Sequence, residues 1–156
     1  GGGGGLGNFT SAHCLFVLEF GARNPIADMV VLSNQHLIAC SWDGRLRSMD
    51  LRRRACTGVT EVSSVGLRAL CVAPPRQVGE EATVWVGTED CCISCWSVPT
   101  QGTATQLCSW KAHYAHVTGL VLWKDWLIST SEDKTIRIWL ASDGTSLEEF
   151  YGHAGA

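Results

Sequence analysis

Residues 111–153 contain a serine, a histidine and an aspartate, the three side chains that many hydrolases use for nucleophilic catalysis. Ser131 and Asp133 stand two residues apart, and His113 precedes both of them. Such catalysis needs an exposed serine oxygen beside a site that stabilises the oxyanion. The G-x-S-x-G sequence that presents such a serine is absent from the chain. We therefore expect no enzymatic activity and assign these residues a structural role.

Eight cysteines could in principle bind a metal or form disulfides. They are Cys14, Cys40, Cys56, Cys71, Cys91, Cys92, Cys95 and Cys108. Cys92 and Cys95 have C-x2-C spacing, but a zinc site needs four ligands and no second pair follows at matching spacing. Most of the cysteines stand among apolar neighbours, which predicts small buried side chains in a reduced, intracellular protein of the cytoplasm or nucleus. We expect no metal and no other cofactor.

Composition excludes several classes of partner. Hydrophobic residues make up 46% of the 156 residues and charged residues 17%, which is typical of a globular chain. The net charge of -3 argues against a nucleic-acid partner, because binding to phosphates depends on many lysines and arginines. Every apolar segment is shorter than the roughly 20 residues that a membrane span requires. We therefore expect neither a nucleic-acid nor a membrane partner.

The elements that must position the serine, histidine and aspartate are short strands. Residues 117–123, 126–131, 135–139 and 147–151 are rich in strand-forming residues and are separated by turns, which predicts four antiparallel strands. The same order of strands and turns occurs twice upstream. The repeated positions are a turn aspartate (Asp43, Asp90, Asp133), a hydroxyl two residues before it (Ser41, Thr88, Ser131) and a large side chain six residues after it (Met49, Trp96, Trp139). The aspartates lie 47 and 43 residues apart, which suits a propeller blade.

These units resemble WD repeats, which build β-propellers from four-stranded blades. The resemblance implies an all-β fold: a partial β-propeller of three four-stranded antiparallel blades plus one strand of a preceding blade. The expected segments are a glycine-rich leader (1–9), the preceding strand (10–21), blade one (22–62), blade two (63–110), blade three (111–151) and the start of a further repeat (152–156).

The resemblance also implies a buried hydrogen-bonded chain in each blade, formed by a histidine, a hydroxyl, an aspartate and a tryptophan. Blade three has the full tetrad His113, Ser131, Asp133 and Trp139. The other two blades have partial tetrads, Ser41 and Asp43 in blade one and Thr88, Asp90 and Trp96 in blade two. Where the histidine is expected, blade one has Ala22 and blade two has Ser63 and Ser64.

Because propellers commonly serve as rigid platforms, the resemblance implies protein or peptide partners and a scaffold function. The loops before the first strands and the aspartate turns should share one face, with Trp42 as the first candidate contact. Other candidates on that face are Arg23, Asn24, Glu89, Tyr114, His116 and Glu132. Three blades are fewer than the four to eight of a closed propeller. We expect either a fragment of a longer propeller or a ring completed by self-association or by another chain.

The alternative function is recognition of a phosphorylated or acidic peptide, as in a substrate-recruiting subunit of a ubiquitin ligase. Five arginines within ten residues favour it: Arg45, Arg47, Arg52, Arg53 and Arg54. Guanidinium groups bind phosphates and carboxylates in a bidentate manner. The competing interpretation is a solvated turn, because Arg52–Arg54 should lie on the face opposite Trp42.

Overall fold

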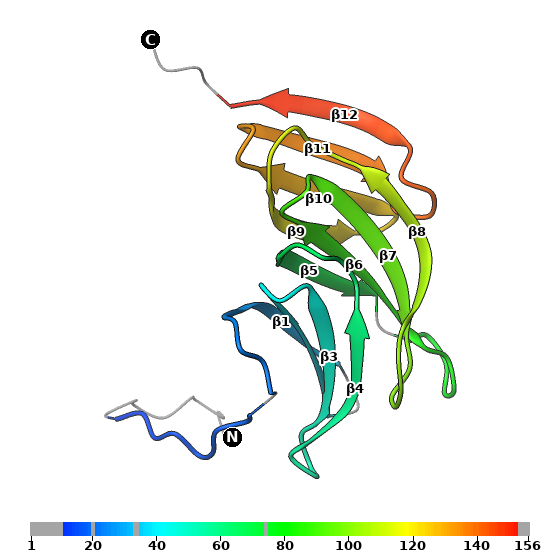
Figure 1. Ribbon diagram of the computed structural model, residues 1–156. Coiled ribbons are helices and arrows are strands. Elements are labelled where there is room, and N and C mark those ends of the chain that lie inside the picture. The colour runs from blue at the N-terminus through cyan, green and yellow to red at the C-terminus, as the bar shows by residue number, and fades with distance from the viewer. Residues whose placement is uncertain (1–10, 20, 33–34, 74, 153–156) are drawn as a thin grey trace, which may run out of the picture.

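Twelve strands make up the regular structure of the described part of the chain (Figure 1). The computed structural model describes residues 11–19, 21–32, 35–73 and 75–152. Blade one consists of β1 (Ile26–Leu32), β2 (His36–Ser41), β3 (Arg45–Asp50) and β4 (Ala55–Glu61). Blade two consists of β5 (Leu67–Ala73), β6 (Ala82–Thr88), β7 (Cys92–Val98) and β8 (Thr105–Lys111). Blade three consists of β9 (Val117–Trp123), β10 (Trp126–Ser131), β11 (Thr135–Leu140) and β12 (Ser146–Tyr151).

Each blade is an antiparallel sheet whose spatial order follows the chain, and blade two lies between the other two (Figure 1). The prediction of three four-stranded antiparallel sheets is confirmed. The first strands β1, β5 and β9 lie next to one another, since β5 contacts both β1 and β9. Asp28 strengthens the first of these contacts, because its Oδ2 accepts a hydrogen bond of 3.1 Å from the backbone amide of Leu70.

The aspartate turns between the second and third strands share one backbone conformation. The residue after the aspartate has a positive φ in every blade: +80° at Gly44, 71° at Cys91 and 70° at Lys134. Glycine adopts this left-handed conformation without steric cost, whereas other residues are strained in it. In blade one the glycine is also required by space, because a Cβ on Gly44 would lie 2.0 Å from the carbonyl oxygen of Ser63.

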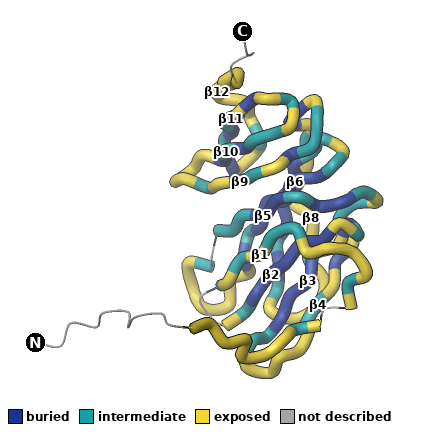
Figure 2. The backbone as a smooth tube through the Cα atoms, turned by 90° about the vertical axis from the view of Figure 1, so that its left-hand side faces the viewer, coloured by how far each residue is buried: buried dark blue, intermediate teal, exposed yellow. Residues whose placement is uncertain are grey.

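The core lies between the blades. Ile38, Cys40 and Leu46 of blade one pack against blade two, where Val84 and Trp96 belong to the same buried cluster. The next cluster joins blade two to blade three and includes Trp85, Ile93, Leu127 and Trp139. Figure 2 shows the result as buried inner strands, in contrast to β12, which is exposed along its whole length.

The outer face of blade three is apolar but uncovered within the described residues. Ile93, three residues after its turn aspartate, is fully buried between blades, whereas Ile136 at the equivalent position is 45% exposed. Phe150 pairs with Ile136 and is 49% exposed, and Val121 on β9 is 58% exposed. The face that would pack against a following blade is therefore present and open.

The segment before blade one differs from the prediction. Residues 11–19 form no strand, although the repeat pattern predicts one over residues 10–21. A single strand is not stable without neighbours that satisfy its backbone hydrogen bonds, and no other strands of a preceding blade are described. Leu18 packs instead against the outer face of blade one, beside Leu37 and Met49. The expected leader (1–9) and residues 153–156 of the expected further repeat, including His153, lie outside the described residues.

The cysteines are free thiols, but fewer are buried than the sequence predicts. Only Cys40 and Cys95 are buried, four others are half-buried, and Cys14 and Cys56 are exposed. Burial raises the pKa of Cys40 and of Cys95 to about 12, so both thiols stay protonated at neutral pH. The described residues contain no cluster of three or more His, Cys, Asp or Glu side chains arranged to hold a metal ion. They also contain no helix with the length and apolarity needed to cross a bilayer.

Candidate partner-binding surface

A buried hydrogen-bonded chain crosses blade three. The indole Nε1–H of Trp139 donates to Ser129 Oγ at 2.9 Å, and this hydroxyl lies 2.7 Å from Nε2 of His113. The other ring nitrogen, Nδ1, lies 2.9 Å from Oδ2 of Asp133. A carboxylate can only accept, so Nδ1 carries the proton and Nε2 accepts from the serine. Each of these polar groups thereby has a partner.

The hydroxyl of this chain is Ser129 and not Ser131, so the predicted serine assignment is wrong. Trp139 pairs directly with Leu127, which makes Ser129 its diagonal neighbour on the same face of the sheet. An indole reaches a diagonal neighbour but not the next position along the strand. Ser131 lies past an irregularity in the pairing of β9 with β10, and its Oγ donates to the carbonyl of Ala115 at 3.2 Å.

Burial and hydrogen bonds set the charges of this chain. Desolvation lowers the pKa of His113, although Asp133 opposes this effect, so the imidazole is neutral at pH 7. Desolvation raises the pKa of Asp133, but hydrogen bonds from Thr135, the amide of Tyr114 and His113 outweigh it and hold that pKa well below its usual range. Ser129 is fully buried and its oxygen already accepts the indole proton. A substrate would therefore have no access to this serine.

Blade one replaces the histidine and tryptophan with a buried arginine. The guanidinium of Arg47 donates from Nη2 to Asp43 Oδ2 at 2.6 Å and from Nη1 to Ser41 Oγ at 2.8 Å. The side chain of Arg47 is 4% exposed and that of Asp43 is 13% exposed. The hydrogen bond from Arg47 lowers the pKa of Asp43 to about 2. Blade one therefore encloses an ion pair where blade three encloses a neutral histidine.

Blade two has a shorter network. Thr88 Oγ1 donates to Asp90 Oδ1 as the repeat pattern predicts, but Asp90 is exposed and forms no hydrogen bond with a histidine of the described residues. Trp96 donates from Nε1 to Ser94 Oγ at 2.8 Å, on its own strand. The position equivalent to Ser129, four residues before the aspartate, is Val86 in this blade. Without a hydroxyl there, the indole and the aspartate of blade two are not linked.

The exposed candidate Trp42 lies in the aspartate turn of blade one and forms a layered cluster with blade two. The guanidinium carbon of Arg68 lies 4.2 Å from the centre of the Trp42 ring. Arg68 is held in turn by Glu89, with Nε donating to Oε1 at 2.7 Å. Trp42 remains 43% exposed, so part of a rigid aromatic ring faces solvent.

A cavity of about 340 Å³ lies beside this cluster and involves all three blades. Ile26, Ala27, Trp42, Arg68, His116, Thr118 and Glu132 line it. On the blade three side, Nδ1 of His116 lies 3.5 Å from Glu132 Oε2, and both side chains are exposed. The structure thus brings four of the predicted contact residues, Trp42, Glu89, His116 and Glu132, into one region.

The remaining candidates are placed differently. Arg23 and Asn24 are exposed in the loop before β1, where the carbonyl of Pro25 accepts a hydrogen bond from the Trp42 amide. Tyr114 is 79% exposed, and the guanidinium of Arg137 lies 5.1 Å from its ring centre. All three lie in or next to loops that precede a first strand, as predicted.

The arginine cluster does not form one surface. Arg47 is buried against Asp43, so it cannot contact a partner, and its assignment as a candidate contact is wrong. Arg45 begins β3 at the aspartate turn, whereas Arg52–Arg54 follow the opposite end of this six-residue strand. Six strand residues span about 20 Å, so these groups cannot hold one phosphate together.

Sequence reasoning missed Arg68, which covers one side of Trp42. The sequence contained a signal, because Arg68 is the one charged residue in the apolar strand Leu67–Ala73. Arg68 is the extra residue of an irregularity between Leu67 and Ala69 in the pairing of β5 with β6, so simple strand alternation does not predict its direction. Its contact with a tryptophan 26 residues earlier depends on the packing of two blades.

Comparison with known proteins agrees with this geometry. Residues 104–139 match the family model described as WD domain, G-beta repeat. No curated protein matches the sequence. The crystal structure of the computationally designed protein Ika4 superimposes with a TM-score of 0.70 at 22% identity, covering 92% of this chain and 82% of that chain. The designed protein Ika8, crystallised in P63, gives a TM-score of 0.65 at 22% identity, covering 82% of this chain and 37% of that chain. At 22% sequence identity, the similarity to these two designed proteins supports a shared fold and nothing more.

Proposed function

We propose that the chain is a non-enzymatic platform that binds protein or peptide partners through the surface around Trp42, because residues 104–139 match the family model described as WD domain, G-beta repeat. WD repeat domains generally mediate protein interactions. The observation that carries the proposal is the half-exposed Trp42 ring stacked on Arg68, beside a cavity to which all three blades contribute.

Physical reasons favour this surface over others. Tryptophan and arginine are enriched among the residues that dominate binding energy at interfaces. Arg68 already holds Trp42 in place, and Glu89 holds Arg68. Fixing the side chains of Trp42 and Arg68 in a complex would therefore cost little conformational entropy. His116 and Glu132 add polar groups at the rim that can fix the orientation of a peptide.

The test is an array of random peptides probed with the whole chain, followed by calorimetric affinities of the peptides that bind. Trp42→Ala is expected to weaken them by about 30-fold, which corresponds to the roughly 2 kcal/mol of an interface hot spot. The matched control is Trp123→Ala, because Trp123 is 51% exposed and lies at the far end of β9. Equal losses with both variants, or no loss with Trp42→Ala, would refute the proposal.

We also propose that the open face of blade three receives another blade, from a longer chain or from a second copy. The equivalents of Ile136, Phe150 and Val121 in blade two are Ile93, which is buried against blade three, and Trp110 and Cys71, which are partly buried there, and this supports the role. Light scattering of the 156-residue chain is expected to detect association that Ile136→Glu abolishes, because a carboxylate cannot be buried there without a partner. A monomer at all concentrations would exclude the second copy and leave the longer chain.

A further inference from the structure

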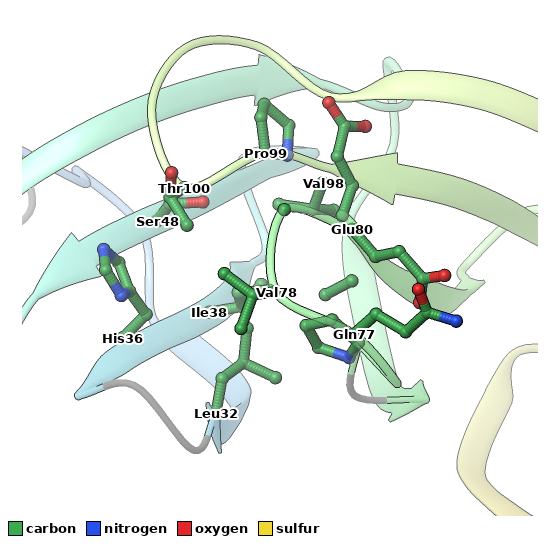
Figure 3. A pocket seen from close by; sticks show the side chains of 14 residues that line it. Leu32, His36, Ile38, Ser48, Gln77, Val78, Glu80, Val98, Pro99 and Thr100 are labelled. Carbon is green, nitrogen blue, oxygen red and sulfur yellow. The ribbon is translucent and has the colours of Figure 1, made fainter.

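A second cavity, of about 370 Å³, lies at the end of the strands away from the aspartate turns (Figure 3). Its lining comes from the adjacent ends of β1 and β2, from Ser48 on β3, and from the β5–β6 and β7–β8 connections, so it lies between blades one and two. The volume falls in the range of ligand pockets, roughly 300 to 1,000 Å³. The cavity around Trp42 shares none of its lining residues.

The β5–β6 loop builds one wall of this cavity and is peculiar to blade two. Eight residues connect β5 to β6, whereas three connect β1 to β2 in blade one and two connect β9 to β10 in blade three. The described part of the β5–β6 loop is ordered by local hydrogen bonds, because Glu80 Oε2 accepts from the amide of Arg76 at 3.0 Å and Glu81 accepts from Ser97 Oγ. The loop presents Val78, which is fully exposed, at the cavity.

The lining combines apolar side chains with unpaired negative charge. Leu32, Ile38 and Val98 contribute apolar surface, and Figure 3 shows Val78 close to the first two. Glu80 and Glu81 also line the cavity, whose described lining contains no lysine or arginine; both glutamates border a neighbouring cavity to which Arg76 and Lys124 contribute. Among the described residues, neither glutamate forms an ion pair.

Ser48 supplies a polar group inside the cavity. Its side chain lines the cavity although the residue is only 6% exposed, and its hydroxyl forms no hydrogen bond to any described residue. The equivalent positions, five residues after the turn aspartate, are Cys95 and Ile138, which are apolar. The hydroxyl of Ser48 remains accessible from the cavity, so a ligand can take the place of the water that would otherwise solvate it.

We propose that this cavity binds a basic peptide segment of a partner protein, with an aliphatic side chain inside and an adjacent lysine or arginine at Glu80 and Glu81. The apolar lining accounts for the aliphatic residue, and the unpaired carboxylates account for the cation. The hydroxyl of Ser48 forms a hydrogen bond with a polar group of the peptide. An acidic or phosphorylated segment is disfavoured, since it would bring like charges together. This site is independent of the Trp42 surface.

The test uses a phage-displayed library of random seven-residue peptides, panned on the Trp42→Ala chain so that ligands of the other surface are not selected. The enriched peptides are expected to carry an aliphatic residue next to lysine or arginine. Their affinity, measured by fluorescence anisotropy, is expected to fall about tenfold or more with Glu80→Lys and to decrease with added salt. Val78→Ser is expected to weaken binding about threefold or more, through lost apolar contact.

Both substitutions lie in an exposed loop outside the strands, so the blades are expected to fold, and Val78→Ser leaves the hydrogen bond from the Arg76 amide to Glu80 in place. The matched control is Glu148→Lys, which makes the same charge change on exposed β12 and is expected to leave affinity unchanged. The proposal is overturned if no basic peptides are enriched, if Glu80→Lys binds them as the parent does, or if Glu148→Lys weakens them equally. Because the panned chain already lacks Trp42, none of these outcomes depends on the function proposed above.

Discussion

Replacing Asp43 with alanine is expected to lower the free energy of unfolding by about 3 to 5 kcal/mol. The variant would leave the guanidinium of Arg47, which is 4% exposed, without its carboxylate. A buried charge that loses its partner costs far more than the pair contributed, because the cation must stay desolvated. Unfolding in urea, followed by tryptophan fluorescence, measures the change.

The chain offers a matched control for this prediction. Asp90 occupies the same turn position in blade two, but it is exposed and its side chain bonds to the hydroxyl of Thr88 rather than to a cation. Asp90→Ala is expected to cost only about 1 kcal/mol. Equal losses for the two variants would show that the turn aspartate stabilises the turn itself and that the ion pair with Arg47 contributes little.

The same pair makes stability depend on pH. Because Arg47 lowers the pKa of Asp43 to about 2, the folded state keeps this carboxylate charged where the unfolded state, with a pKa of about 4, takes up a proton. Its contribution is complete above about pH 4 and is lost as the pH falls through about 2. Between these values the parent chain is expected to lose stability more steeply than Asp43→Ala.

Ser129→Ala is expected to cost about 2 to 4 kcal/mol, the second largest effect. The change removes the one hydroxyl that joins Nε2 of His113 to the indole of Trp139. His113 is 1% exposed and Trp139 is 5% exposed, so water cannot replace the lost partner without opening the blade. Each orphaned buried group costs about 1 to 3 kcal/mol.

The control for this prediction is Ser131→Ala, two residues further along β10. Ser131 is half-buried and bonds only to the backbone, as donor to Ala115 and acceptor from the amide of Asp133. Its loss is expected to cost about 1 kcal/mol, again measured by urea unfolding. If Ser131→Ala is the more damaging change, the hydrogen-bonded chain through Ser129 does not stabilise the blade.

Sequence patterns predicted the blades but not all of their contacts. The spacing of Asp43, Asp90 and Asp133 located three turns correctly, because a tight turn depends on residues that are neighbours in the chain. The prediction of Ser131 as the hydroxyl of the chain was wrong because strand alternation puts Ser129 and Ser131 on the same face. Their roles differ only through the register of β10 against β11 and the irregularity near Ser131.

The contacts of Arg47 and Arg68 could not be predicted from the sequence either. Arg47 stands in a basic run that predicts a charged surface, yet the pleat of β3 turns it inward to Asp43. Arg68 was not among the contact residues predicted from the sequence, yet the packing of blade two on blade one brings it to the ring of Trp42. In both cases a shift of one strand position would move the guanidinium to the other face of the sheet.

The sequence by itself determined the all-β class, the number of four-stranded units and the positions of their turns, because these depend on local periodicity and on turn residues. The tertiary structure alone decided which polar groups meet inside each blade and which loops enclose the two cavities. Residues that are distant in the chain meet there: Glu80 lines the same cavity as His36, and Arg68 contacts the ring of Trp42 beside the other cavity. These contacts depend on register and blade packing to within an ångström or two, which the distance range of a hydrogen bond requires.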